Sequence, residues 1–593
     1  MCGIAGILSF DAPPDEARVR RMERALRHRG PDGRGLVSSG AACLAHTRLS
    51  LLDLAGSAQP FTSRDGRYVL TYNGEIYNHR ELRAELGSGW DFQTRGDVEV
   101  VLAAYARWGD GALARLDGMF AFCIWDSLRQ EAFLARDRLG VKPLVYTRNE
   151  RELLFASEAK ALLAAEDRAP RAHAPSIVEY LVAPCFSGVE HGMFERTEHL
   201  LPGHCMRVSR AGVEIAAWWE PRLDPQDSES MALLPSLREA LGASVSRSLR
   251  ADVPVGAYLS GGLDSTLLTA LAAREAEMAT FTIAFEGQES YDYARSAIVI
   301  SDDAPFAALA ARELGVAMEI VPVPRAGMAE DLAQIAAIDD ALPAWEQEIA
   351  QHHLARAASR HVKAVLVGDA ADETHYGYHF LLDEEATRAP EAILRRLGSV
   401  PVRRDRFPDP VSRLDAHYRS LVERAGGRRG TKRERQMATT LLILKRWLPR
   451  LLHNGDIHTM AFGLEARVPF AGIDLLDVAL RVPPELGLRG GVEKWALREV
   501  AKGLVPEAVR VRRKSALPKD QGVGEIWRAE ARRAIEEEGQ LLGEILDLEA
   551  VRAWLDPARP LSEGERAGLF RIAALGAWAR RYGVVAASGD APW

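Results

Sequence analysis

The sequence feature that most constrains the fold is the segment SGGLDS at residues 260–265. An apolar run at 253–259 precedes it and predicts a buried strand, and a helix is predicted to begin near Thr266. Two adjacent glycines allow backbone N–H groups to turn inward around an anion, and the N-terminus of a helix adds partial positive charge. The segment therefore predicts a phosphate-binding loop at the end of a strand.

The residues around this loop alternate between strand and helix patterns. Apolar runs at 280–285 and 363–367 predict two further buried strands, and helices are predicted at 266–275 and 304–314. Strands that alternate with helices are typical of a parallel sheet covered on both faces. We therefore expect an α/β parallel-sheet domain in the second part of the chain.

The first part of the chain has a different pattern. Short strands are predicted at 68–72, 119–125 and 131–135, separated by Asn-Gly, Asp-Gly and similar turn signals. Helices are predicted at 17–27 and 97–108, where apolar residues recur at three- and four-residue spacing. Many short strands interrupted by a few helices indicate an α+β layered domain.

The stretch PRLDPQDSES at 221–230 is rich in proline and acidic residues and is typical of a linker. We place a first domain at 2–215, a linker at 216–235 and a second domain at 236–593. Within the second domain, a segment at about 400–436 is basic, with eleven Lys and Arg against five Asp and Glu from 401 to 436. It is either a solvated helical insertion or a docking surface for an anionic partner.

Composition excludes several classes of protein. The net charge of −8 argues against a broadly basic nucleic-acid binder, and no uncharged apolar run is long enough for a membrane helix. Five cysteines without a CxxC pair predict neither a disulfide scaffold nor a structural zinc site. The N-terminus lacks the basic and apolar regions of a secretory signal. We expect a cytoplasmic enzyme that binds neither nucleic acid nor membrane.

Cys2 follows the initiator methionine directly. Removal of the methionine would leave a residue that carries both a thiol and a free α-amine. The ordinary pKa values of these groups are about 8.5 for the thiol and about 7.7–8.0 for the amine, so the amine can accept the thiol proton near neutral pH. Cys2 is therefore a candidate nucleophile for attack on an amide.

Four motifs follow Cys2 in the order RGPD at 29–32, HTRLS at 46–50, YNGEIYN at 72–78 and RGD at 95–97. With Cys2, they resemble the class II glutamine amidotransferases, which use an N-terminal nucleophile. The resemblance implies a glutaminase domain with L-glutamine as a substrate, bound and cleaved by six residues: Cys2, Arg48, Asn73, Gly74, Glu75 and Asp97.

The implied roles suit the chemistry of these side chains. The planar guanidinium of Arg48 would grip the substrate carboxylate, and the carboxylates of Glu75 and Asp97 would bind its α-ammonium group. The Asn73 amide and the Gly74 N–H would form the oxyanion hole, because both are neutral donors aimed at developing negative charge.

SGGLDS is not a Walker A loop, since the chain contains no GxxxxGK[ST]. It resembles the pyrophosphate loop of the N-type ATP pyrophosphatases, which cleave ATP between the α and β phosphates. By that resemblance Ser260, Gly261, Gly262 and Ser265 would bind ATP, and Asp264 would hold Mg²⁺.

Further segments support the same resemblance. The strand 281–285 matches the one that meets the adenine, which assigns Ile283 to ATP binding. The loop GDAADE at 368–373 and the segment EKWALR at 493–498 match the second acidic loop and a lysine-containing segment of the family. They imply ATP binding by Gly368, magnesium binding by Asp372 and Glu373, and catalytic roles for Asp369 and Lys494.

Residues 2–520 together resemble the glutamine-dependent asparagine synthetases of the B type. The resemblance implies that glutamine is hydrolysed at Cys2 and that its ammonia reaches a second site. There a carboxylic acid would react with MgATP to give an acyl-adenylate, which ammonia would convert to an amide. The implied cofactors are ATP and Mg²⁺, and the family suggests a homodimer.

Two departures bear on the acceptor acid. Asp369 stands where the family usually has glutamate, and Trp345 and Glu346 lie where asparagine synthetases carry mostly small residues near the acceptor. If these two side chains face the site, they would crowd and repel aspartate. We therefore expect a specialised or peptide-like carboxylate as acceptor. The alternatives are an ordinary asparagine synthetase that uses L-aspartate, a lactam-forming cyclase and a non-catalytic glutamine sensor.

Overall fold

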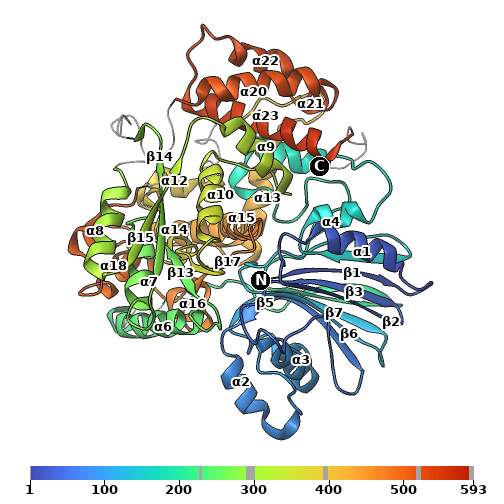
Figure 1. Cartoon of the computed structure of the whole chain (residues 1–593). Helices are drawn as coiled ribbons and strands as arrows, with labels where there is room; N and C mark the ends of the chain where they lie inside the picture. The colour runs from blue at the N-terminus through green and yellow to red at the C-terminus, as the bar shows by residue number, and fades with distance from the viewer. Residues whose placement is uncertain are drawn as a thin grey trace.

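The computed structural model describes residues 2–225, 230–288, 301–338, 340–391, 399–515 and 522–585. Figure 1 shows an N-terminal domain of stacked sheets, in blue and cyan, beside a domain with a central sheet in green. The C-terminal helices, in red, form a layer above the second domain, and the N-terminus lies near the junction of the two domains (Figure 1). Residues 226–229 of the predicted linker lie outside the described residues.

The N-terminal domain contains two six-stranded antiparallel sheets. The first has the order β10-β8-β9-β1-β3-β2, in which β1 is paired on both sides, to β3 and to β9. Its strands are β1 (Gly3–Ser9), β2 (Gly33–Ser39), β3 (Ala42–Arg48), β8 (Val145–Arg148), β9 (Glu152–Ala156) and β10 (Glu198–His199). Because Cys2 immediately precedes β1, this pairing fixes the backbone beside the candidate nucleophile.

The second sheet has the order β12-β11-β7-β6-β5-β4. Its strands are β4 (Phe61–Thr62), β5 (Tyr68–Ile76), β6 (Gly118–Asp126), β7 (Glu131–Arg136), β11 (His204–Ser209) and β12 (Gly212–Ala217). Apolar side chains of both sheets meet in one core, which includes Ile4, Leu44, Val69 and Trp125. The predicted strands at 68–72, 119–125 and 131–135 are confirmed within β5, β6 and β7.

Helices cover the outer faces of these sheets. The first sheet packs with α1 (Glu16–Ala25) and α4 (Ala159–Ala164), and the second with α2 (His79–Leu86) and α3 (Asp97–Trp108). The α3 helix has the predicted bounds, and its buried face includes Val98, Val101 and Leu102. The order helix, sheet, sheet, helix confirms the α+β layered fold class.

The second domain is built on a five-stranded sheet of order β15-β14-β13-β16-β17, in which every pairing is parallel. Its strands are β13 (Val255–Tyr258), β14 (Ala279–Phe285), β15 (Ala317–Val323), β16 (Ala364–Leu366) and β17 (Glu465–Arg467). This arrangement confirms the α/β parallel-sheet class. Loops that follow β13 and β16 emerge at the same edge, because the strands are parallel.

Helices surround this sheet and continue into the C-terminal layer. Those around the sheet include α6 (Leu233–Ser248), α7 (Leu263–Ala272), α8 (Ala304–Leu314), α10 (Gln347–Ala358), α11 (Ala371–Thr374), α15 (Leu448–Met460), α16 (Ile473–Ala479), α17 (Pro484–Gly487), α18 (Trp495–Val500) and α19 (Glu507–Val511). The second apolar core of this half is formed with α5 (Ala174–Val182), α9 (Met328–Ile338), α13 (Pro410–Arg424), α14 (Lys432–Leu442), α20 (Gly524–Glu537), α21 (Gly539–Ile545), α22 (Leu548–Arg552) and α23 (Glu563–Tyr582). The short helix α12 (Glu384–Arg388) packs instead on the core around the sheet, through Ala386. None of the helices in the described ranges is long and apolar enough to cross a membrane.

The predicted start of the helix that follows SGGLDS is wrong. The helix expected from Thr266 begins at Leu263, with Gly262 as its N-cap in an extended conformation. The turn is shorter than the pattern suggested because Gly261 has a φ of 72°, which reverses the chain within one residue. Asp264 and Ser265 therefore lie in the first turn of α7 rather than in the loop before it.

The basic segment at about 400–436 is largely helical. It contains α13 and the first turn of α14, and α13 buries Leu414, Tyr418 and Val422. Its cations also form ion pairs within the domain, such as Arg429 with Glu391 at 2.5 Å. Of the two interpretations drawn from the sequence, the amphipathic helix supports the solvated helical insertion rather than the docking surface.

Candidate active sites

Cys2 lies at the N-terminal end of the central strand β1 and is buried. Its backbone N–H donates to Asn73 Oδ1 at 3.0 Å, and the N–H of Gly3 donates to Thr47 Oγ1 at 3.1 Å. Burial raises the pKa of the Cys2 thiol, and the positive charge of Arg48 acts in the opposite direction. The thiol therefore needs a proton acceptor to become a nucleophile, and the adjacent α-amine would supply one.

A small pocket brings together five of the predicted glutamine-site residues. Cys2, Arg48, Gly74, Glu75 and Asp97 line it. Further lining comes from apolar and polar neighbours that include Leu49, Leu51, Ser57, Gln59, Tyr72 and Val98. These residues come from β1, β3, β5, α3 and the loop after β3, so the pocket exists only when both sheets are assembled.

Asn73 and Gly74 lie on β5 beside Cys2. Asn73 Oδ1 accepts from Cys2, whereas its buried Nδ2 has no hydrogen-bond partner among the described residues. A Cβ added at Gly74 would lie 2.3 Å from the Met119 carbonyl oxygen, so this position requires glycine. An unpartnered amide donor on the side chain next to Cys2 is suited to an anionic oxygen.

Glu75 and Asp97 are two acidic residues that line the same pocket. Asp97 Oδ2 accepts from the Tyr72 hydroxyl at 2.7 Å and from the Ile76 N–H at 2.9 Å. Burial and the adjacent charge of Asp97 raise the pKa of Glu75 well above its usual range, although Arg467 lies 3.3 Å away. Two neighbouring buried carboxylates form a favourable place for a substrate ammonium group.

Arg48 also lines the pocket. Its two terminal nitrogens donate to the carbonyl oxygens of Leu54 and Asp53, both at 2.9 Å. The guanidinium is thereby held in one orientation before a substrate arrives, which is an arrangement suited to a carboxylate.

Replacement of Arg48 by lysine is expected to raise the KM for glutamine by about 10–100-fold and to change kcat much less, because a point charge loses the bidentate geometry. The measurement is glutamate release at varied glutamine concentration, with Arg34→Lys on the neighbouring strand β2 as the matched control. An unchanged KM would contradict a role for Arg48 in binding.

A second cavity, of about 450 Å³, opens at the edge of the parallel sheet. It is lined by nearly all the residues predicted for ATP, namely Ser260, Gly262, Asp264, Ser265, Ile283, Gly368, Asp369, Asp372, Glu373 and Lys494. The cavity thus lies beyond the ends of β13, β14 and β16, where open α/β sheets bind their ligands.

The SGGLDS segment forms a tight turn into α7. A Cβ at Gly261 would lie 2.3 Å from the backbone nitrogen of Ala307, so only glycine fits against α8. Ser260 Oγ and Ser265 Oγ lie 3.0 Å apart, and Ser265 Oγ accepts from the Ser260 N–H at 3.2 Å. These bonds hold both hydroxyls at the N-terminus of the helix, where an anion is favoured.

Oppositely charged side chains meet across the cavity. Lys494 Nζ lies 2.5 Å from both Asp264 Oδ2 and Asp372 Oδ1, and Lys514 Nζ lies 2.7 Å from Asp372 Oδ2. Against the effect of burial, the two lysines lower the pKa of Asp372. Lys494 also has a φ of 54°, which is rare for a residue with a side chain and is typical of functional positions.

Two other acidic residues of the cavity, Asp369 and Glu373, have raised pKa values. Burial and the charge of Asp372 raise the pKa of Asp369 to about 6 and that of Glu373 to about 7. The Tyr378 hydroxyl donates to Glu373. Several carboxylates that share a cavity and repel one another are stabilised by a divalent cation.

The side chains of this cavity include the groups that magnesium and phosphates prefer. Asp264, Asp372 and Glu373 carry hard oxygen atoms, and Lys494 and Lys514 carry cations suited to phosphates. Among the described residues, however, no group of three or more His, Cys, Asp or Glu side chains is placed to hold a metal ion. Apolar neighbours of Ile283, such as Leu259 and Phe281, also line the cavity and would suit an adenine ring.

Trp345 and Glu346 are not among the described residues that line this cavity. They precede α10, and Trp345 packs against the apolar core shared with the C-terminal layer. In their place α10 contributes Gln351, and α15 contributes His458 and Thr459. The argument that Trp345 and Glu346 crowd the acceptor therefore lacks support from the structure.

The side of the cavity that α10 and α15 form, and the buried residue Glu348 that supports it, were not identified from the sequence. Buried Glu348 accepts from the Ala344 N–H at 2.7 Å and lies 3.2 Å from His458 Nε2. Gln351 follows Glu348 by one turn on α10, and its place in the cavity depends on the packing of α10 on α15. The only local signal for this arrangement was the spacing of three residues between Glu348 and Gln351, which makes them neighbours on the surface of a helix.

The fold and the two cavities define a glutamine amidotransferase joined to an ATP-dependent synthetase domain. Residues 1–219 match the glutamine amidotransferase domain family, and residues 236–580 match the asparagine synthase family. The chain therefore belongs to the asparagine synthase family, and it is an ATP-dependent ligase of the glutamine-using, asparagine synthetase-like type.

Its relatives match over most of the chain. It is 29% identical over 537 residues to asparagine synthetase (glutamine-hydrolyzing) 3 of Bacillus subtilis (strain 168), which covers 88% of this chain and 87% of that protein. It is 32% identical over 550 residues to asparagine synthetase B (glutamine-hydrolyzing) of Escherichia coli (strain K12), which covers 89% of this chain and 83% of that protein.

Proposed function

We propose that the protein hydrolyses glutamine at Cys2 and uses the ammonia to amidate a carboxylic acid that it has activated with MgATP. The observation that supports this proposal is that most of the residues predicted to act on glutamine and ATP in the two half-reactions, all except Asn73 and Gly261, line two separate cavities. In the first, the Cys2 thiolate attacks the glutamine amide, ammonia leaves, and water opens the resulting thioester to glutamate. Asn73 Nδ2 and the Gly74 N–H face the developing oxyanion.

In the second cavity, the acceptor carboxylate attacks the α-phosphate of ATP and pyrophosphate leaves. Ser260, Ser265 and the N-terminus of α7 would hold the phosphates, and Lys494 would neutralise charge on the α-phosphate. Mg²⁺, held by Asp264, Asp372 and Glu373, would supply charge neutralisation to the departing pyrophosphate. Ammonia then attacks the acyl carbon, and AMP leaves.

For the acceptor, we propose a specialised or peptide-like carboxylic acid. The wall of the cavity from α10 and α15 offers Gln351, His458 and Thr459, which are hydrogen-bonding side chains without a permanent positive charge. Buried Glu348 lies 3.2 Å from His458 Nε2, and a carboxylate there would disfavour a second carboxylate on the acceptor. Aspartate, which carries two carboxylates, is the alternative acceptor.

The test is an acceptor screen on the purified protein with glutamine and MgATP. Pyrophosphate, AMP and glutamate are measured together with aspartate, acyl amino acids and short peptides as acceptors. We expect acceptor-dependent pyrophosphate release with a monoanionic or peptide-like acid. Stoichiometric asparagine and AMP, with a KM for aspartate in the micromolar to low-millimolar range, would instead establish aspartate as the acceptor.

A further inference from the structure

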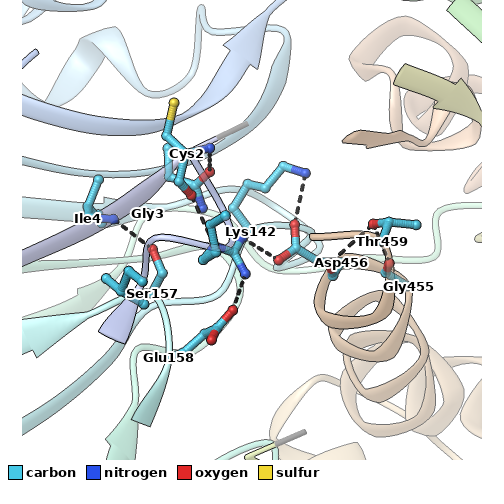
Figure 2. Close-up of polar contacts among 12 residues, drawn as sticks. Cys2, Gly3, Ile4, Lys142, Ser157, Glu158, Gly455, Asp456 and Thr459 are labelled. Atoms are coloured by element: carbon cyan, nitrogen blue, oxygen red, sulfur yellow. Dashed lines mark hydrogen bonds and ion pairs between the residues drawn. The ribbon is translucent and has the colours of Figure 1, made fainter. Parts of the chain in front are cut away.

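Two consecutive residues of α15 contact different parts of the protein, one the synthetase cavity and the other the glutaminase domain. Gly455 lines the synthetase cavity, and a Cβ added there would lie 3.2 Å from Asp369 Oδ2. Asp456 instead contacts the glutaminase domain, where its oxygens lie 2.6 Å from Arg29 and 3.2 Å from Lys142. Figure 2 shows Asp456 on its helix facing Lys142, with Cys2 beyond it. Any shift of this turn of α15 therefore reaches both domains.

Arg29 joins Asp456 to the nucleophile. Its Nε donates to the carbonyl oxygen of Cys2 at 3.0 Å, and its two terminal nitrogens bind Glu158 at 2.7 Å and Asp456 at 2.6 Å. One rigid guanidinium thus connects the Cys2 backbone to a helix of the other domain. Glu158 directly follows Ser157 in the chain. The Oγ of Ser157 accepts from the N–H of Ile4 (Figure 2).

The side chains that connect Cys2 to α15 are buried in the protein interior. The side chains of Arg29, Lys142 and Glu158 are 0% exposed, and that of Asp456 is 1% exposed. Charged groups buried in this way cannot exchange their partners for water without a large desolvation cost. A displacement of Asp456 is therefore expected to move Arg29 with it rather than to break the pair.

We infer that the Arg29–Asp456 pair is a positioning contact that couples occupancy of the synthetase cavity to the placement of Cys2. The inference rests on the proposed function of the two cavities. A nucleotide at Asp369 would act on Gly455 and the adjoining turn of α15, and Asp456 and Arg29 would pass the shift to the Cys2 carbonyl. Asp456 and Arg29 are positioning residues, since neither lines the glutamine pocket.

The inference is tested by nucleotide binding to two forms of the protein. The probe is the magnesium complex of α,β-methylene-ATP, whose α–β bond cannot be cleaved. Its dissociation constant is measured by calorimetry for the full chain before and after Cys2 is alkylated with a diazoketone analogue of glutamine. Because the filled glutamine pocket and the nucleotide would act on the same contact, we expect alkylation to change this dissociation constant by about fivefold or more.

Asp456→Asn is expected to reduce this factor to less than about twofold, because the amide keeps the shape but loses the charge that holds Arg29. Glu81→Gln is the matched control. Glu81 pairs with Arg250 at 2.8 Å and so crosses the same domain boundary, but it lines neither cavity. This control should keep the coupling factor of the unmodified protein.

Gly455→Ala provides a second variant, since alanine favours a helix and folding should be retained. Its added methyl group presses on Asp369, and we expect a change of about threefold or more in kcat/KM for glutamate release at the distant Cys2 site. An unmodified protein without coupling, a folded Asp456→Asn that keeps the coupling, or unchanged glutamate release in Gly455→Ala would overturn the inference. A protein that releases no glutamate at all would instead overturn the proposed function.

Discussion

Replacement of Cys2 by alanine is expected to lower glutamine-dependent amide formation by about 10³-fold or more, while ammonia-dependent formation stays within about twofold of the unmodified rate. Without the thiol no thioester can form, and the other residues of the glutamine pocket cannot replace a nucleophile. The synthetase cavity contains no atom of Cys2, so its chemistry should continue when ammonium salts supply the nitrogen.

The measurement compares pyrophosphate release with glutamine and with ammonium chloride as nitrogen source. Cys205→Ala is the control, because Cys205 is also buried in the N-terminal domain but lies in the core on the other sheet. Equal loss with both nitrogen sources would contradict the separation of the two reactions. It would also mean that Cys2 contributes to the fold rather than to glutamine hydrolysis alone.

The second large effect is expected at Lys494. Its replacement by methionine should lower pyrophosphate release by about 10²–10³-fold with either nitrogen source, while glutamate release from glutamine is largely kept. The substitution removes the cation that lies 2.5 Å from both Asp264 and Asp372. Those carboxylates would then repel each other and the phosphates of ATP without compensation.

Two further variants show whether this effect is chemical. Lys502→Met is the control on the same stretch of chain, since Lys502 is exposed and pairs only with Glu499 among the described residues. Lys494→Arg keeps the charge and should recover part of the activity. If Lys494→Met reduced glutamate release as strongly as pyrophosphate release, the residue would be acting through overall stability.

Much of both sites could be predicted because their residues lie in short continuous segments. The Gly261–Gly262 pair, between an apolar strand and a helix, predicts an anion-binding turn from local backbone chemistry alone. The position of Cys2 next to the initiator methionine likewise depends on no other part of the chain. The boundary of α7 was wrong because the conformation of Gly261 is set by its contact with α8.

The expectation for Trp345 and Glu346 shows where local reasoning has the least information. Their positions matched a segment near the acceptor, but the direction of side chains at the start of α10 depends on how α10 packs against α15 and the C-terminal layer. Packing places Gln351 on the cavity wall instead. The sequence carries no local signal for that choice, because several faces of α10 are buried against different neighbours.

The sequence by itself determined the two fold classes and predicted a candidate nucleophile and a candidate phosphate-binding turn, because each depends on neighbouring residues and on their backbone preferences. Only the tertiary structure decided which charges meet: Lys494 with Asp264, and Arg29 with Asp456. These partners are separated by more than two hundred positions in the chain. Their contact follows from the packing of whole helices and domains, which excludes water and leaves each charge only the partner that the fold brings to it.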